Sequence, residues 1–262
     1  MAAPMGPTAT FNPIASFVQG MRKGPPWDSI VEFASHPSFC GMRLYPRQMT
    51  LLKLIYLETE TMTQYDIDVI NGWCTGFKDR LNPLGVQPDI WERIAYLKAH
   101  GYTHFPHIQM VLGRRASKGI LGGILTAERV AYLYSLGNWQ QHFNQVRGQI
   151  AEVQVVAPSL NLAVTRQFKD VRNTIINCEY LREHIVGDKI TEFFIRTPGD
   201  EQTIIENQLA GIKSDREIAT IALKASTSAS TSGRGGTGIM NLYDEYAHMI
   251  TGTGSAKTGE EI

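Results

Sequence analysis

A short apolar run in the middle of this chain leads into small and basic residues that could bind phosphate. The run covers residues 108–112, and the loop after it reads Gly113-Arg114-Arg115-Ala116-Ser117-Lys118-Gly119. An apolar strand, a short loop with one lysine and then a helix is the layout of a phosphate-binding loop, whose backbone N–H groups point at the anion. The helix N-terminus adds about half a positive charge. Lys118 could then reach the outer phosphates of a nucleotide.

The loop departs from the common phosphate-binding pattern, G-x-x-x-x-G-K-[ST]. Leu112 stands at the first glycine position, with Gly113 one residue later, and Ser117 stands at the second glycine position. Gly119 replaces the Ser or Thr whose hydroxyl would contact Mg²⁺. The alternative interpretation is an ordinary strand-to-helix turn with exposed basic residues.

Adjacent carboxylates far downstream would complement this loop. Asp244 and Glu245 follow a mostly apolar stretch that begins at Ile239, which predicts a strand ending in the acidic pair. Ligands of parallel α/β sheets bind at the carboxyl ends of strands. There Asp244 could hold Mg²⁺ directly or through water, and Glu245 could polarise a water that attacks the γ-phosphate. A lone acidic pair is more often simply exposed.

An aromatic residue, a proline and a glutamine precede the loop in the stretch Tyr45-Pro46-Arg47-Gln48. Pro46 suits the first turn of a helix. The stretch could form an adenine pocket in which Gln48 hydrogen-bonds the edge of the base. The alternative is a helix start with a solvated glutamine, because polar residues are mostly exposed.

Hydrophobic periodicity predicts the elements that would position these residues. Ile120, Ile124, Ala127 and Ala131 recur at helical spacing directly after the loop. A strand followed by a helix occurs again after residue 151, so we expect a parallel sheet with right-handed crossovers. Helices are predicted at 28–36 (with Asp28 as N-cap), 66–77 and 88–100, and strands at 152–157, 189–196 and 217–224, with 204–212 ambiguous.

Composition excludes several classes of function. The chain has 262 residues, 43% of them hydrophobic, and a formal net charge of +0, so global charge gives no argument for nucleic-acid binding. Its three cysteines are far apart, and the histidines at 100, 104 and 107 lack a further ligand, so neither a disulfide framework nor a zinc site is expected. No apolar stretch approaches the roughly 20 residues of a membrane span, and no secretory signal is recognisable. We expect a soluble intracellular protein.

Four stretches together resemble the ATPase domain of the large terminase subunit, the genome-packaging motor of tailed bacteriophages and related viruses. Residues 45–48 resemble its adenine motif, 113–119 its variant Walker A loop, 157–159 the strand end after the first β/α unit, and 242–249 its Walker B segment. The last is the most specific, since the family often carries Asp-Glu-Ala-Ala-His-Met there. The resemblance implies a three-layer α/β P-loop NTPase of the ASCE or RecA-like type, with a central, mostly parallel sheet and helices on both faces.

The resemblance also implies roles for individual residues. Lys118 would bind the β- and γ-phosphates, Asp244 would coordinate Mg²⁺, and Glu245 would be the catalytic base. Arg234, in the Gly-rich run before Walker B, matches an arginine that acts in trans on the ATP of the next subunit. The contacts expected for the nucleotide come from Tyr45, Gln48, Gly113, Arg114, Arg115, Ala116, Ser117, Lys118 and Gly119.

At the level of the whole protein, the resemblance implies ATP hydrolysis that drives double-stranded DNA into a procapsid in the host cell cytoplasm. Its partners would be DNA, the portal protein, the small terminase subunit and further copies in a homo-oligomeric ring, with no membrane involved and the isolated domain monomeric. We expect an N-terminal arm with lid-like helices at 1–40, the ATPase domain at 41–250, and a flexible tail at 251–262, before the family's coupling motif and nuclease domain.

Two other functions remain open at this stage. A helicase-like DNA-dependent ATPase of the same wider fold would share Gln48, Lys118 and Glu245. A scaffold protein with a degenerate, non-hydrolysing nucleotide fold would explain why Ser117 and Gly119 depart from the common loop pattern.

Overall fold

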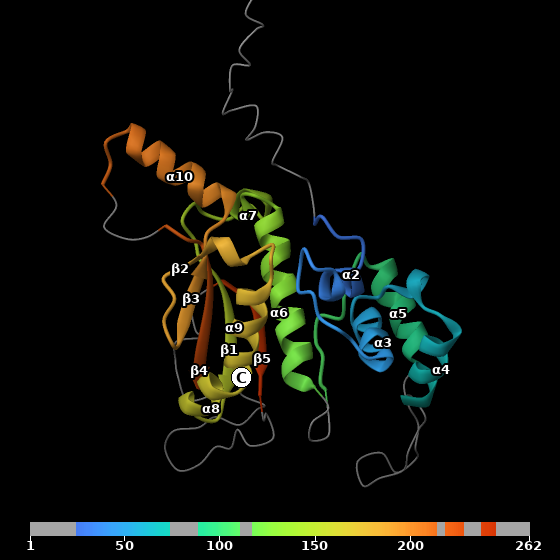
Figure 1. Cartoon of the computed structure of the whole chain (residues 1–262). Helices are drawn as coiled ribbons and strands as arrows, with labels where there is room; N and C mark the ends of the chain where they lie inside the picture. The colour runs from blue at the N-terminus through green and yellow to red at the C-terminus, as the bar shows by residue number, and fades with distance from the viewer. Residues whose placement is uncertain (1–24, 74–88, 111–116, 214–217, 228–236, 245–262) are drawn as a thin grey trace, which may run out of the picture.

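The chain folds as an α/β protein. A computed structural model describes residues 25–73, 89–110, 117–213, 218–227 and 237–244 (Figure 1). Its elements in chain order are α2 (Ile30–Ser35), α3 (Pro46–Ile55), the 3-10 turn η1 (Thr59–Thr61), α4 (Gln64–Trp73), α5 (Ile90–Ala99), α6 (Lys118–Ser135), α7 (Trp139–His142), β1 (Ala151–Ala157), α8 (Leu160–Thr165), α9 (Gln167–Asn177), the 3-10 turn η2 (Arg182–His184), β2 (Ile185–Val186), β3 (Glu192–Ile195), α10 (Pro198–Leu209), β4 (Ile221–Thr227) and β5 (Thr237–Tyr243).

The sheet has five strands in the order β2-β3-β4-β1-β5. The strand β1 is parallel to both of its neighbours, β4 and β5. The hairpin of β2 and β3 joins the opposite edge, where β3 runs antiparallel to β4. The predicted mostly parallel arrangement is therefore confirmed for the three strands at the centre and one edge, and the sheet as a whole is mixed.

The two faces of this sheet differ in polarity. Val153 and Val155 of β1 point into a core that they share with α6 and α9. The alternate positions carry Glu152 and Gln154, and Glu152 accepts a hydrogen bond from Lys224 of the neighbouring strand. The face that carries Glu152 and Gln154 therefore combines paired polar side chains with small or apolar ones such as Ala222 and Val156, all of them buried.

The helices that share a core with the sheet lie over one face. The helices α6 and α9 form the layer next to the sheet, and α2 and α3 pack on the far side of α6 (Figure 1). Within the described ranges, the three layers are thus sheet, helix pair and outer helices. For the described residues, the expectation of helices on both faces is not confirmed, although every residue of β1 is buried.

Glycines in α6 let it approach α9 closely. A Cβ atom at Gly122 would lie 2.4 Å from Nε2 of Gln167, and one at Gly123 would lie 2.4 Å from Oγ1 of Thr174. A side chain at either position would require Gln167 or Thr174 to move. The first turns of α6 and α9 are therefore held side by side.

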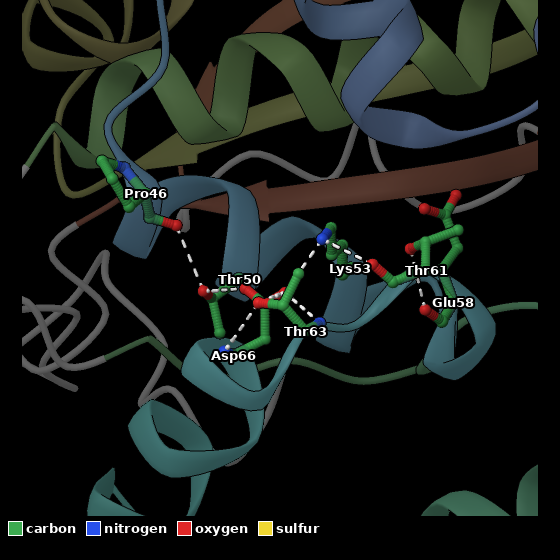
Figure 2. A network of polar contacts seen from close by, with 7 residues as sticks. All are labelled: Pro46, Thr50, Lys53, Glu58, Thr61, Thr63 and Asp66. Atoms are coloured by element: carbon green, nitrogen blue, oxygen red, sulfur yellow. Dashed lines mark hydrogen bonds and ion pairs between the residues drawn. The ribbon is translucent and has the colours of Figure 1, made fainter.

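A polar network anchors α3, the helix that begins at the predicted base-binding motif. The carboxylate of Asp66 in α4 accepts hydrogen bonds from Thr50, from Lys53 at 2.9 Å and from the Thr63 backbone at 2.8 Å (Figure 2). Burial alone would raise the pKa of Asp66, but the hydrogen bonds from Thr50, Thr63 and Lys53 hold it well below its usual range. The network fixes α3 against the start of α4.

Several local predictions are corrected. The N-cap of α2 is Ser29 rather than Asp28, since the Ser29 hydroxyl accepts from the Glu32 N–H at 3.1 Å. Residues 108–110 form no strand, and they line cavities beside α3 instead. The ambiguous stretch 204–212 belongs mostly to α10, whose N-terminus is capped by Thr197. Of the helices that the structure describes, none has the length and apolar character needed to span a bilayer.

Candidate functional site

The predicted phosphate-binding lysine is the first residue of α6. The residue before it, Ser117, has φ 60° and ψ 26°, in the left-handed region of the backbone. Glycine adopts that conformation without steric cost, whereas a residue with a Cβ atom does so at a cost of about 1–2 kcal/mol. Ser117 thus stands at a glycine position of the common loop pattern and keeps the backbone conformation that glycine favours.

Lys118 and Asp244 converge in space. The Lys118 ammonium lies 3.1 Å from Oδ1 of Asp244, and the two side chains are 53% and 6% exposed. The Asp244 N–H donates to the Val156 carbonyl at 2.9 Å, which extends the pairing of β5 and β1 to the residue after β5. Both residues therefore meet at the carboxyl ends of parallel strands, the edge at which α/β sheets bind ligands.

A third charged residue, Asp170 in the first turn of α9, joins this site. A Cβ atom at Gly119 would lie 1.8 Å from Oδ2 of Asp170, so that carboxylate fills the space a side chain at position 119 would need. Partial desolvation raises the pKa of Asp170, and the charge of Asp244 raises it further while Lys169 lowers it. The two carboxylates are thus close enough to affect each other.

The donor set suits a magnesium ion bound together with a nucleotide. Mg²⁺ usually keeps several waters and is held by one or two carboxylates plus substrate phosphates. Asp244 and Asp170 are carboxylates of this kind beside a lysine. Clusters of three or more His, Cys, Asp or Glu side chains able to hold a metal without a substrate do not occur in the described part of the chain.

Of the two predicted base-binding residues, Gln48 lies beside a cavity. Gln48 accepts a hydrogen bond from the Tyr45 N–H through Oε1 at 2.8 Å, so its carbonyl helps to begin α3. The side chain of Tyr45 is 73% exposed. Gln48 also lines a cavity of about 740 Å³ that reaches Leu121 in the first turn of α6. Gln48 thus has the structural role that the alternative interpretation gives it, and it also faces a space next to the lysine helix.

Some predicted site residues cannot be placed. Gly113, Arg114, Arg115, Ala116, Arg234 and Glu245 lie outside the described residues. Asp170 was not predicted as a site residue from the sequence, because a single aspartate in the first turn of an amphipathic helix is usually solvated. The one sequence feature that points to Asp170 is Gly119, because a residue without a side chain leaves room for a group from another element.

Comparison with known proteins identifies no relative. No family model, no curated protein and no solved structure matches this chain. Function is therefore inferred from the geometry of the site and the sequence motifs, since a fold alone does not determine function.

Proposed function

We propose that this chain binds Mg²⁺–ATP and hydrolyses it, as the ATPase domain of a viral large terminase that moves double-stranded DNA into a procapsid. The observation that carries the proposal is the 3.1 Å contact between Lys118 and Asp244. A P-loop ATPase requires its loop lysine and its Walker B aspartate at one triphosphate. Lys118 and Asp244 are 126 positions apart in the sequence, so a contact between them satisfies a requirement that few folds would meet by chance.

Each residue has a role in this proposal. Lys118 moves from Asp244 to the β- and γ-phosphates when the nucleotide binds, and backbone N–H groups at the start of α6 contact the same phosphates. Asp244 would hold Mg²⁺, and the bound ion would supply positive charge for the phosphate oxygens. Glu245, the next residue, orients the attacking water and takes its proton.

The P-loop NTPase fold and the motor function remain parts of the proposal. Their support is the four-stretch resemblance, especially residues 242–249, together with the parallel strands β1 and β5. In an assembled ring, Arg234 would act on the ATP of the neighbouring copy. Because the net charge is +0, DNA would be bound by a local patch, and phosphate contacts would make that binding salt-sensitive.

Calorimetry and a turnover assay test the enzymatic part. We expect the wild-type chain to bind a non-hydrolysable ATP analogue with Mg²⁺ and to hydrolyse ATP slowly. Glu245→Gln should retain binding and lose turnover, and Lys118→Ala should lose both, whereas Lys213→Ala, at an exposed lysine elsewhere, should behave as wild type. Absence of any heat of binding for the folded wild-type chain would support the scaffold alternative. Normal turnover by Glu245→Gln would refute the assignment of the base.

A further inference from the structure

Position 119 lacks the hydroxyl group that the common phosphate-binding loop provides there. In the common phosphate-binding loop, the residue after the lysine is Ser or Thr, and its hydroxyl binds Mg²⁺. Here that residue is Gly119, which has no side chain to offer. A Mg²⁺ site at Lys118 and Asp244 would therefore be one protein ligand short.

The carboxylate of Asp170 fills the space beside Gly119. Oδ2 of Asp170 lies 1.8 Å from the point where a Cβ atom of residue 119 would be, so an oxygen from α9 lies close to where a side chain on α6 would begin. Asp170 is exposed, which leaves its carboxylate open to a ligand. The side chain that residue 119 lacks and the carboxylate of Asp170 would thus occupy the same space.

Packing holds α9 in this position. Gly122 and Gly123 allow the close contact with α9 described above. The side chain of Gln167, one turn before Asp170, is buried and donates to the Gly119 carbonyl at 3.4 Å. The start of α9 is thus fixed to the start of α6, and Asp170 lies at the end of α6 that carries Lys118.

We propose that Asp170 is an acidic ligand of the Mg²⁺ that accompanies the nucleotide, bound directly or through a water, and that it replaces the missing hydroxyl of residue 119. This inference rests on the proposed function, because it needs a nucleotide phosphate at Lys118. It assigns a site built from three elements: Lys118 on α6, Asp170 on α9 and Asp244 after β5. Glycine at position 119 fits this arrangement, since a Cβ atom there would push the Asp170 carboxylate from its present position.

The test measures how strongly Mg²⁺ increases ADP affinity, which needs no catalysis. ADP binding is measured by calorimetry with excess Mg²⁺ and again with a chelator, for wild type, Asp170→Asn and the control Asp68→Asn, an exposed aspartate on α4. We expect Asp170→Asn to reduce the Mg²⁺-dependent gain in affinity by about 10–100-fold, the usual cost of disturbing the surroundings of a metal. Affinity without metal should stay the same or rise, because a negative charge near the phosphates is removed.

A compensating pair of substitutions sharpens the test. Gly119→Ser alone should weaken the Mg²⁺ effect, because its Cβ would push the Asp170 carboxylate out of its present position. Combined with Asp170→Ala it should regain the effect, since the two Cβ atoms would be 3.4 Å apart and the serine hydroxyl returns to its usual place. Circular dichroism checks that each variant is folded.

The outcomes separate this inference from the proposed function. If wild type binds ADP with a clear Mg²⁺ effect and Asp170→Asn keeps it as Asp68→Asn does, the role of Asp170 is refuted and the ATPase proposal stands. If folded wild type binds no ADP with or without Mg²⁺, both proposals fail together.

Discussion

Replacing Asp66 with Asn tests whether the network that anchors α3 depends on charge. Oδ2 of Asp66 accepts from Lys53 and from both the backbone and the hydroxyl of Thr63, and Oδ1 accepts from Thr50 (Figure 2). An asparagine can keep these hydrogen bonds if its oxygen faces Lys53 and Thr63. Its NH₂ group would then donate to the Thr50 hydroxyl, which still reaches the Pro46 carbonyl at 3.1 Å. The substitution therefore removes the charge and little else.

The expected cost follows from burial. The side chains of Lys53 and Asp66 are 14% and 5% exposed, so the lysine would be left largely buried without its partner charge. Hydrogen bonds to charged groups contribute about 1.5–3 kcal/mol, and neutral ones roughly half of that. We expect Asp66→Asn to lower the free energy of unfolding by about 2 kcal/mol. Asp66→Ala, which also removes every acceptor, should cost about 4 kcal/mol, as for a broken buried pair.

Urea unfolding at several pH values measures both the cost and its cause. Because the folded-state pKa of Asp66 is depressed, its contribution is present above the pKa of the unfolded chain and is lost as pH falls through the folded-state value. The difference between wild type and Asp66→Asn should therefore be full at pH 7 and shrink in acid. Asp68→Asn, an exposed neighbour on α4, is the control. If Asp66→Asn costs no more than Asp68→Asn at pH 7, the charge does not stabilise α3.

Three further predictions concern the helix α6. Ser117→Gly should raise the free energy of unfolding by about 1 kcal/mol, because glycine adopts the left-handed backbone conformation without strain and the Ser117 side chain makes no capping hydrogen bond that would be lost. A decrease in the free energy of unfolding, measured in urea, would contradict this reasoning. Gly123→Ala should cost about 1–3 kcal/mol through its clash with Thr174, and Thr174→Ala in the same chain should recover most of that loss in thermal melts. Burial raises the pKa of Glu128, so the folded chain binds its proton more tightly than the unfolded chain, and stability is lost as pH rises through the folded-state value. Glu128→Gln, which can still accept from Tyr56, should gain stability relative to wild type as pH rises through the folded-state pKa of Glu128, and a pH-independent difference would exclude this cause.

The sequence predicted those features that depend on local pattern. The Val-rich run of β1, the proline at the start of α3 and the strand that ends before Asp244 all follow from short-range rules, and the structure confirms them. The meeting of Lys118 with Asp244 was also expected from the sequence, although residues 108–110 do not form the strand that was expected before the loop.

Features that depend on tertiary packing were missed. The contact between Glu152 and Lys224 joins two different strands, which the pattern of a single strand does not reveal. Asp170 became a site residue only because glycines bring α9 onto α6. The apolar residues of α10 gave an ambiguous pattern since several stay exposed, with Leu209 at 84%.

The length of α6 has a structural consequence. Its 18 residues make a helix about 27 Å long, with Lys118 at one end. Just past the other end, the Gly137 carbonyl accepts from the Gly199 N–H of α10 at 2.9 Å, and Tyr134 contacts His184 at 2.8 Å. One helix thus connects the end that carries Lys118 with the contacts that hold the start of α10.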